Sequence, residues 1–522
     1  FELSHANKLY DQNREFILEH NFYWPDFNLY LSKIRQGWQG ELTARELYTS
    51  EPHRGSLIQE FYLVLGLMGK NVGLDPNFSY QLGRLILSPL LLLIVILLVS
   101  YLFRGALWQI LTFIIVFVSG SFPRIYTDSQ GALQVGRFME WWSNIDAVQR
   151  ITFVPHILFG QVVSFFILYQ FIVNKFNISG KKIALLIFLG NAAGLVFPPS
   201  LITLNSVLLL ILFIPLVKTL ILPTGDKTRK LQIVSNIIFI VLTLPSLLYI
   251  FIITKIPPWT ALIDFHRTHP MMIPFWEYIL GTGPIFFLGI LGAMTVVLNR
   301  DRKFQPFILW VLVTFLFAIL FTHLKEQSPL RFTQTGLFIP LGILGTYFLQ
   351  KTSKVLGKIT SIIVALYILE NLYMMKVSLD WQTTFITQRV GANIPAVPYP
   401  PQTLYPLKNW MEGIRFLRDN ATKEDVILAE ITAGNFIPAY AGKTVYFGQS
   451  NTIDFEEKQL NVQKFYRGEL TPESVQSFLH ESKVTYIFFS TQEKDLSQGR
   501  DLVTFYPTLK KVYSNDNVII YR

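Results

Sequence analysis

The hydrophobic residues of this chain gather into long runs that are separated by shorter polar stretches. Residues 85–103 contain no charged side chain, and about 20 apolar residues in a helix are enough to cross the hydrocarbon core of a bilayer. The sequence therefore predicts an α-helical polytopic membrane protein. About ten spans are expected, at residues 85–103, 107–122, 154–173, 183–197, 200–222, 232–254, 275–298, 306–323, 333–350 and 359–376.

Polar material flanks these runs at both ends of the chain. Apolar residues in the first segment share one face of a helix whose other positions are polar, which predicts interfacial helices. The last segment alternates helical and strand patterns, which predicts a small α/β domain. We therefore expect a first loop at 1–83, a transmembrane domain at 84–376, a Pro-rich linker at 377–406 and an α/β domain at 407–522.

Orientation follows from the Lys and Arg residues, which concentrate in every second loop. Cytoplasmic loops carry the excess of these residues in membrane proteins, so both polar ends are expected to be extracytoplasmic, at the plasma membrane. A first outer segment of this length would need a preceding helix to carry it across, and we expect one more span upstream. The basic loops contain Arg104; Lys175, Lys181 and Lys182; Lys227, Arg229 and Lys230; Arg300, Arg302 and Lys303; and Lys351, Lys354 and Lys358.

Composition narrows the function classes. Of the 522 residues, 51% are hydrophobic and 15% are charged, whereas about a quarter are charged in typical soluble proteins. The net charge of +10 is explained by the basic loops, so we expect no nucleic-acid partner. The chain has no cysteine, which excludes disulfides, thiolate metal sites and cysteine nucleophiles.

Motifs of soluble nucleotide-binding and hydrolytic enzymes are missing from the sequence. It contains no P-loop, dinucleotide fingerprint, HExxH motif or nucleophile elbow. The run from Gly434 to Gly442 follows a predicted strand but lacks the glycine spacing of a nucleotide-binding loop. We interpret it as a strand-to-helix connection.

Two polar groups in the first loop are candidates for chemistry. Asp26 stands at the start of a predicted short helix, where a carboxylate either caps the helix or acts as a general base at the membrane surface. Glu51, His53 and Arg54 lie within four residues of each other. Such a cluster can bind a phosphate or a divalent metal, the one cofactor we consider, and it is also ordinary for an exposed loop.

Cations at the outer ends of spans are the other candidates. Arg331 lies just before an apolar run, so we expect it at the outer membrane surface. It is either an interfacial arginine whose head reaches water or a bidentate clamp for a phosphate. Arg124 is a second cation in the outer loops.

Taken in order, these features resemble the GT-C class of membrane glycosyltransferases, whose relatives include protein O-mannosyltransferases and aminoarabinose transferases. The shared order is a first outer loop with an Asp, many spans, a last outer loop with an Arg and an outer C-terminal α/β domain. Three stretches resemble a bacterial group of that type: Asp26 through the run Tyr48-Thr49-Ser50-Glu51-Pro52-His53, the run from Arg331 to Leu341, and the run from Gly434 to Gly442.

The resemblance implies that a sugar is transferred from a polyprenyl-phosphate donor in the cell envelope, with inversion at the anomeric carbon. Asp26 would deprotonate the acceptor hydroxyl, and Arg331 and Arg124 would bind the lipid phosphate. Many relatives carry two adjacent acids in the first loop, whereas here Phe27 follows Asp26. Glu51 and His53 are then the candidates for a second acid or an acceptor site.

Two other function classes stay open. A non-catalytic scaffold or envelope-assembly protein with the same fold would leave Asp26 and Arg331 as isolated surface charges. A transporter would bury ionisable groups near the middle of the membrane, and the predicted spans are almost free of such groups.

Overall fold

The structure is a computed structural model, and it describes residues 13–20, 24–138, 146–221, 227–268, 274–324, 327–392, 399, 402 and 404–522. The chain divides into two compact units. The first unit consists of Phe1–Leu82, Ile252–Phe265 and Gln382–Arg522, and the second consists of Gly83–Phe251 and His266–Trp381.

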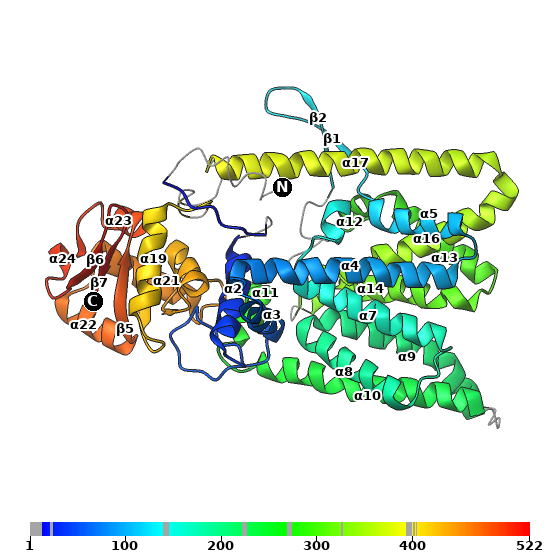
Figure 1. Cartoon of the computed structure of the whole chain (residues 1–522), viewed down its shortest axis with the longest axis horizontal. Helices are drawn as coiled ribbons and strands as arrows, with labels where there is room; N and C mark the ends of the chain where they lie inside the picture. The colour runs from blue at the N-terminus through cyan, green and yellow to red at the C-terminus, as the bar shows by residue number, and fades with distance from the viewer. Residues whose placement is uncertain are drawn as a thin grey trace. The chain divides into compact units, whose positions relative to one another are not determined.

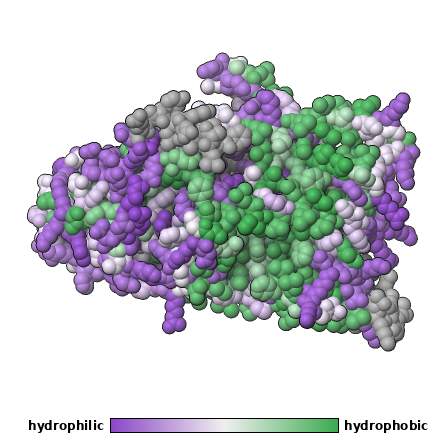
Figure 2. Space-filling model, viewed as in Figure 1, coloured by the Kyte–Doolittle hydropathy of each residue, from purple (hydrophilic) through white to green (hydrophobic). Residues whose placement is uncertain are grey.

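Apolar helices make up the second unit (Figure 1), and hydrophobic residues gather over them on the face that Figure 2 shows. Helices suit these runs because they satisfy every backbone polar group internally, as lipid requires. The helices that lie wholly or mostly in this unit are α4 (Pro76–Leu102), α5 (Ala106–Val118), α6 (Ala147–Arg150), α7 (Pro155–Val173), α8 (Gly180–Val196), α9 (Pro198–Ile221), α10 (Lys227–Ile253), α12 (Phe275–Thr282), α13 (Pro284–Leu298), α14 (Gln305–His323), α15 (Leu330–Thr333), α16 (Phe338–Leu356) and α17 (Lys358–Val390). Helix α11 (Thr260–Thr268) belongs mostly to the first unit.

Every run that the sequence predicts to be a span is largely helical, although 107–122 extends past α5, 275–298 falls on two helices and 333–350 includes the break between α15 and α16. By length and composition, five helices among the described residues can cross a membrane, and a sixth is reached if α12 and α13 form one broken span. The five are Pro76–Leu102, Pro155–Val173, Lys230–Ile253, Arg302–His323 and Lys358–Val390. The chain is therefore a mostly helical membrane protein, and the number of ten spans stays a prediction.

The predicted span at 275–298 is not one straight helix. The axes of α12 and α13 meet at 89°, and the break lies at Gly283, whose φ is +76°. A Cβ atom on this glycine would lie 1.9 Å from the carbonyl oxygen of Gly120. The bend thus requires a glycine at 283, because a side chain there would meet the backbone of Gly120. Pro284 follows at the first position of the new helix.

The linker predicted at 377–406 is also different, because α17 continues to Val390. The sequence has neither Pro nor Gly between 377 and Gly391, so nothing ends the helix earlier. Ile386 and Val390 are buried and pack against Tyr405, which gives the added turns a small apolar contact. Most of the prolines predicted to stiffen the linker lie outside the described residues.

A mixed five-stranded sheet occupies the end of the chain, in the first unit. Its strand order is β4-β3-β5-β7-β6; β3 pairs in parallel with β4 and β5, and β7 pairs antiparallel with β5 and β6. The strands are β3 (Val426–Leu428), β4 (Thr444–Val445), β5 (Val484–Phe489), β6 (Lys511–Ser514) and β7 (Ile519–Tyr521). The helices are α19 (Lys408–Asn420), α20 (Ile431–Tyr440), α21 (Phe455–Arg467), α22 (Pro472–Glu481), α23 (Thr491–Leu496) and α24 (Leu502–Phe505).

For this α/β segment, the separate domain that the sequence predicts at 407–522 stays a prediction. The segment shares the first unit with the N-terminal segment, which contains α2 (Trp24–Gln39) and α3 (Glu60–Asn71). The backbone N–H of Val445 in β4 donates to the carbonyl of Leu47 at 2.9 Å. A buried ion pair also joins Arg389 to Glu19. The N-terminal segment therefore covers polar groups that an isolated domain would expose.

Two buried carboxyl groups lie where the adjacent parallel strands β3 and β5 end. Glu430 caps α20 by accepting from the N–H of Ile431. Glu493 accepts from the N–H of Glu430 at 2.9 Å and from the N–H of Ser490 at 3.0 Å. Burial raises the pKa of Glu430 to about 7, and the neighbouring Glu493 adds to this effect.

This raised pKa predicts a pH-dependent stability. Between the ordinary value of 4.5 and about 7, the folded protein keeps a proton on Glu430 that the unfolded chain has lost. Stability should therefore fall as pH rises through this window, by at most about 1.4 kcal/mol per pH unit for one proton. Glu430→Gln keeps the acceptor oxygen and removes the titration. The unfolding temperature of the variant should therefore rise relative to that of the wild type as the pH is raised from 5 to 7.

The matched control is Glu481→Gln, which changes an exposed carboxylate in the same segment. It should follow the wild-type pH profile of unfolding temperature. A Glu430→Gln profile that runs parallel to the wild type over this window would contradict the assignment.

Candidate active site

Asp26 lies inside the first turn of α2. It is the third residue of that helix and is half-buried, and the two residues after it, Phe27 and Asn28, are fully buried. Because the helix begins before it, Asp26 does not occupy the N-cap position that a capping role requires. A carboxylate in the first turn of a helix interacts favourably with the helix dipole.

Helix α2 is fastened to the C-terminal segment along its length. The side-chain amide of Asn28 donates to Oδ1 of Asn435 at 2.8 Å, and the amide of Gln449 donates to the carbonyl of Pro25 at 3.0 Å. Near the other end, Nε of Arg35 donates to the carbonyl of Ala439 at 2.5 Å. These contacts restrain the helix that carries Asp26.

The glycine-containing run at 434–442 forms most of α20, immediately after β3. A Cβ atom on Gly434 would lie 2.1 Å from the carbonyl oxygen of Phe447, and one on Gly448 would lie 2.3 Å from the carbonyl oxygen of Gly434. The glycines therefore allow two backbone segments to touch. The run is therefore helical, whereas the sequence predicts a strand-to-helix connection, which the structure places at residues 429–430.

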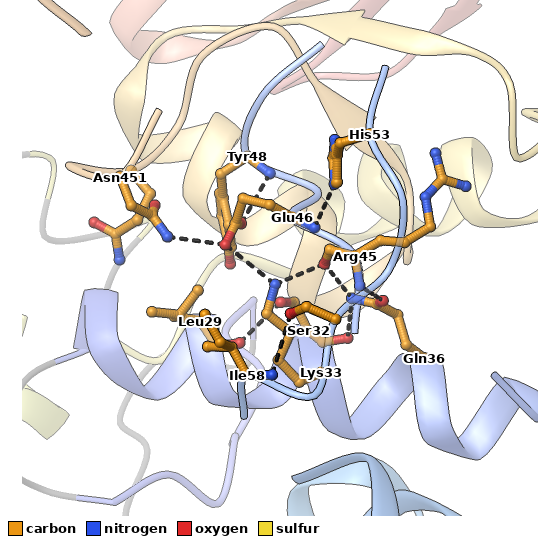
Figure 3. A network of polar contacts seen from close by, with 12 residues as sticks. Leu29, Ser32, Lys33, Gln36, Arg45, Glu46, Tyr48, His53, Ile58 and Asn451 are labelled. Atoms are coloured by element: carbon orange, nitrogen blue, oxygen red, sulfur yellow. Dashed lines mark hydrogen bonds and ion pairs between the residues drawn. The ribbon is translucent and has the colours of Figure 1, made fainter. Parts of the chain in front are cut away.

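A buried polar network lies next to α2 (Figure 3). Nζ of Lys33 donates to the carbonyl of Arg45 at 2.7 Å and to Oε2 of Glu46 at 3.2 Å. The same carboxylate accepts from the amide of Asn451 at 3.0 Å and from the N–H of Tyr48 at 3.3 Å. Lys33 is 0% exposed and Glu46 is 2% exposed. Burial lowers the pKa of Lys33, and the facing carboxylate opposes this.

Arg45 takes part in this network through its backbone carbonyl and N–H, and its guanidinium does not. Its guanidinium points away from the Lys33–Glu46 contact in Figure 3. Its Nε has no hydrogen-bond partner among the residues that the structure describes. Arg45 is thus a cation of the first loop that the sequence analysis did not single out.

His53 uses both ring nitrogens to hold the backbone of its loop. The N–H of Glu46 donates to Nε2 at 2.8 Å, and Nδ1 lies 2.8 Å from the carbonyl oxygen of Glu51. Because an N–H only donates and a carbonyl only accepts, the ring is neutral with its proton on Nδ1. Burial also lowers the pKa of His53, which favours the same neutral form. No lone pair is left for a metal or for an acceptor hydroxyl.

Glu51 is held by Lys458 from the C-terminal segment. Nζ of Lys458 lies 2.6 Å from Oε1 of Glu51, and the hydroxyl of Thr49 donates to the other oxygen. Partial burial raises the pKa of Glu51, but the bonds from Lys458 and Thr49 outweigh it and leave that pKa below its usual value. These contacts favour a charged group that fixes the loop.

Arg331 and Arg124 belong to the second unit. Arg331 lies in α15, is half-buried, and its Nη1 donates to Oε1 of Gln334 at a long 3.3 Å. Arg124 lies in the strand β1 (Pro123–Thr127), and its Nη1 is 3.6 Å from Oε1 of Glu277. The side chains of this pair are 50% and 41% exposed, so the pair is weak.

No metal site is apparent in the described part of the chain. Over those residues, no three His, Asp or Glu side chains come close enough together to hold an ion. We therefore assign no residues to a divalent metal.

The fold is similar to those of solved membrane glycosyltransferases. An oligosaccharyltransferase from Archaeoglobus fulgidus, tethered to an acceptor peptide, has a TM-score of 0.50 and 12% identity, over 98% of this chain and 71% of its own. ArnT from Cupriavidus metallidurans has a TM-score of 0.50 and 11% identity, over 100% of this chain and 96% of its own. The arabinofuranosyltransferase AftD from Mycobacteria has a TM-score of 0.54 and 12% identity, over 99% of this chain and 41% of its own.

This chain has the GT-C fold. The resemblance that the sequence suggests is confirmed at the level of the fold, because these neighbours are GT-C glycosyltransferases and the match to ArnT covers nearly the whole of both chains. No protein-family model and no curated protein matches the sequence. At 11–12% identity, the GT-C likeness concerns architecture and leaves substrates to be proposed.

Sequence reasoning missed the residues that hold the first loop of this GT-C protein together. Lys33 follows Asp26 by seven positions, or about two helical turns, so both project from one side of α2. The signal in the sequence was a lysine among the apolar residues of 27–34, a run in which the structure buries every residue. Glu46 and Asn451, far apart in sequence, gave no comparable signal.

We predict that Lys33→Met strongly destabilises the protein. The substitution leaves the carboxylate of Glu46 buried without its cation, and breaking a buried pair in this way costs about 3–5 kcal/mol. The double variant Lys33→Met/Glu46→Gln removes the stranded charge and should recover much of the loss. Denaturant or thermal unfolding of the detergent-solubilised protein measures both.

The control is Lys423→Met, which breaks an ion pair with Glu41 whose side chains are 61% and 37% exposed. An exposed pair contributes about 1 kcal/mol or less, so this variant should unfold almost like the wild type. Equal losses of unfolding free energy in Lys33→Met and Lys423→Met would show that the buried pair stabilises the protein no more than the exposed pair.

Proposed function

We propose that this chain is an inverting membrane glycosyltransferase that moves a sugar from a polyprenyl-phosphate donor to an acceptor hydroxyl on the outer face of the plasma membrane. The observation that carries the proposal is the GT-C fold over the whole chain, with a half-buried carboxylate, Asp26, at the start of a restrained helix. The neighbours that share the fold include a transferase solved with its acceptor peptide.

Asp26 is the general base in this proposal. An acceptor hydroxyl is a weak nucleophile, and a positioned carboxylate that takes its proton contributes about 10²–10⁴-fold. The acceptor oxygen forms a bond to the anomeric carbon from the side opposite the phosphate. The bond from that carbon to the phosphate oxygen breaks, and its electron pair leaves with the polyprenyl phosphate. The products are an inverted glycoside and the lipid phosphate.

Arg331 and Arg124 bind the lipid phosphate in this proposal. A guanidinium can form two parallel hydrogen bonds to a phosphate, and a cation placed there stabilises the charge that develops as the phosphate leaves. Arg331 donates to the neutral Gln334 at a long 3.3 Å, and Arg124 is exposed beside Glu277. Both geometries are compatible with exchanging the present contact for a phosphate oxygen.

Glu51 and His53 take no chemical part. The ring nitrogens of His53 hold the backbone of Glu46 and Glu51, and the carboxylate of Glu51 holds Lys458. In our proposal they shape the loop that follows α2, and Asp26 acts without a second acid.

The topology belongs to the same proposal. We assign ten spans, with the N-terminal segment and the α/β segment on the outer face and the basic loops in the cytoplasm. The alternation of Lys and Arg along the loops supports this orientation.

Asp26→Asn should reduce transfer from a polyprenyl-phosphate sugar by about 10²–10⁴-fold, with little change in donor binding. A radiolabelled transfer assay in proteoliposomes measures the rate, and equilibrium binding of the donor measures affinity. The control is Asp75→Asn, which changes a carboxylate that accepts from the N–H of Phe78 at the start of α4 and should stay active. Full activity in Asp26→Asn would favour a scaffold with this fold.

Arg331→Ala should weaken donor binding by about 10- to 100-fold, since a hydrogen bond to a charged group contributes about 1.5–3 kcal/mol. Arg331→Lys keeps the charge and should lose less. Arg302→Ala removes an exposed cation at the start of the span Arg302–His323 and serves as the control. Unchanged affinity in Arg331→Ala would remove this residue from the donor site.

The orientation can be tested directly because the chain has no cysteine. Leu42 is 72% exposed and Gln498 is exposed, so Leu42→Cys and Gln498→Cys should both react with an impermeant maleimide in intact cells. Lys182→Cys should react only after the cells are permeabilised. Protection of either of the first two sites would overturn the topology.

A further inference from the structure

A two-stranded hairpin stands out from the helices of the second unit (Figure 1). It consists of β1 and β2 (Leu133–Arg137), which pair antiparallel with Ile125 opposite Val135 and Thr127 opposite Leu133. Its tip is well organised: one carboxylate oxygen of Asp128 accepts from the N–H groups of Gln130 and Ala132, each at 2.9 Å. The hairpin is therefore a shaped element rather than a loose loop.

One face of this hairpin carries exposed apolar side chains, beside Thr127 and the buried Arg137. Alternate residues of a strand point to the same side, so Ile125, Leu133 and Val135 share one face, and Gln134 lies on the other. Ile125 is 67% exposed and Leu133 is 76% exposed. An isolated two-stranded hairpin is only marginally stable in water, and no third strand joins this sheet within the described residues. A partner on the apolar face would supply the missing burial.

The base of the hairpin is fixed to α12. The N–H of Phe122 donates to the carbonyl of Leu280 at 3.0 Å, and Arg124 contacts Glu277. On α12 itself, Phe275 is 51% exposed and Trp276 is 72% exposed. Two elements in contact therefore both expose large apolar side chains, and one of these is a tryptophan, which is enriched at membrane–water interfaces.

The angle between α12 and α13 identifies what covers this surface. These helices meet at 89°, so if α13 crosses the bilayer, α12 lies in the plane of its surface. The hairpin starts five residues after the end of α5, another apolar helix, so its base cannot lie far from the same surface. An apolar face held at this depth meets the boundary between headgroups and acyl chains.

We infer that the β1–β2 hairpin and α12 form a membrane-surface anchor, in which Ile125, Leu133, Phe275 and Trp276 insert into the interfacial layer of the lipid. The occupant of the apolar face is the bilayer itself. The polar face of the hairpin, with Gln134, stays in water. The anchor shares Arg124 of β1 with the proposed donor site, but it requires only that the chain is in a membrane.

The cysteine-free chain allows the anchor to be tested in the full-length protein. Ile125→Cys, Leu133→Cys and, on the opposite face, Gln134→Cys each receive a nitroxide spin label in phosphatidylcholine–phosphatidylglycerol vesicles. Collision of the label with oxygen, which enters lipid, is compared with collision with a water-soluble nickel chelate. The ratio of oxygen to nickel collisions should be several-fold higher at 125 and 133 than at 134. All three positions are exposed, so the labels should not disturb folding.

Two outcomes would overturn the anchor. Equal, water-like collision ratios at 125, 133 and 134 would place the apolar face in solvent. Exclusion of both reagents at 133, together with dipolar broadening between labels on different copies, would assign the face to a second copy of the chain. Trp276→Cys on α12 provides an independent reading, because it should give a lipid-like ratio if the surface is continuous with the hairpin.

Discussion

The ammonium group of Lys33 lies out of reach of water, between the carboxylate of Glu46 and the carbonyl of Arg45. A buried charge is tolerated only when its partner is held in place, so the loop that carries Glu46 must keep one conformation. That conformation presents the N–H of Glu46 to His53, and the same carboxylate accepts from Asn451 in the C-terminal segment. A single electrostatic requirement thus connects α2, the first loop and the α/β segment into one unit.

This connection also bears on the chemistry assigned to Asp26. A catalytic group is effective when it sits on a rigid element whose neighbours are themselves restrained. The residues that follow Asp26 are buried, and Asn28 and Arg35 are bonded to α20. The carboxylate therefore stands at the half-buried start of a helix whose residues 27–34 are all buried, which limits the directions from which a substrate can approach it.

The apolar helices could be predicted because a long uncharged run is a local property of the sequence, as at residues 85–103. The bend at Gly283 could not, because its cause is a backbone contact with Gly120, far away along the chain. The role of His53 escaped for a similar reason: its spacing from Glu51 suggested a binding cluster, but its protonation depends on the N–H of Glu46. The GT-C architecture was accessible from the order of segments, whereas the partners of individual charges were not.

The contact between Gly434 and Gly448 has a consequence for how substitutions at these positions would be tolerated. Each glycine faces the backbone of the other at a distance that excludes even a methyl group. Neither position can therefore change first and be compensated by the other, since no smaller residue exists for the partner to become. Both positions are thus restricted to glycine by backbone packing rather than by the recognition of any ligand.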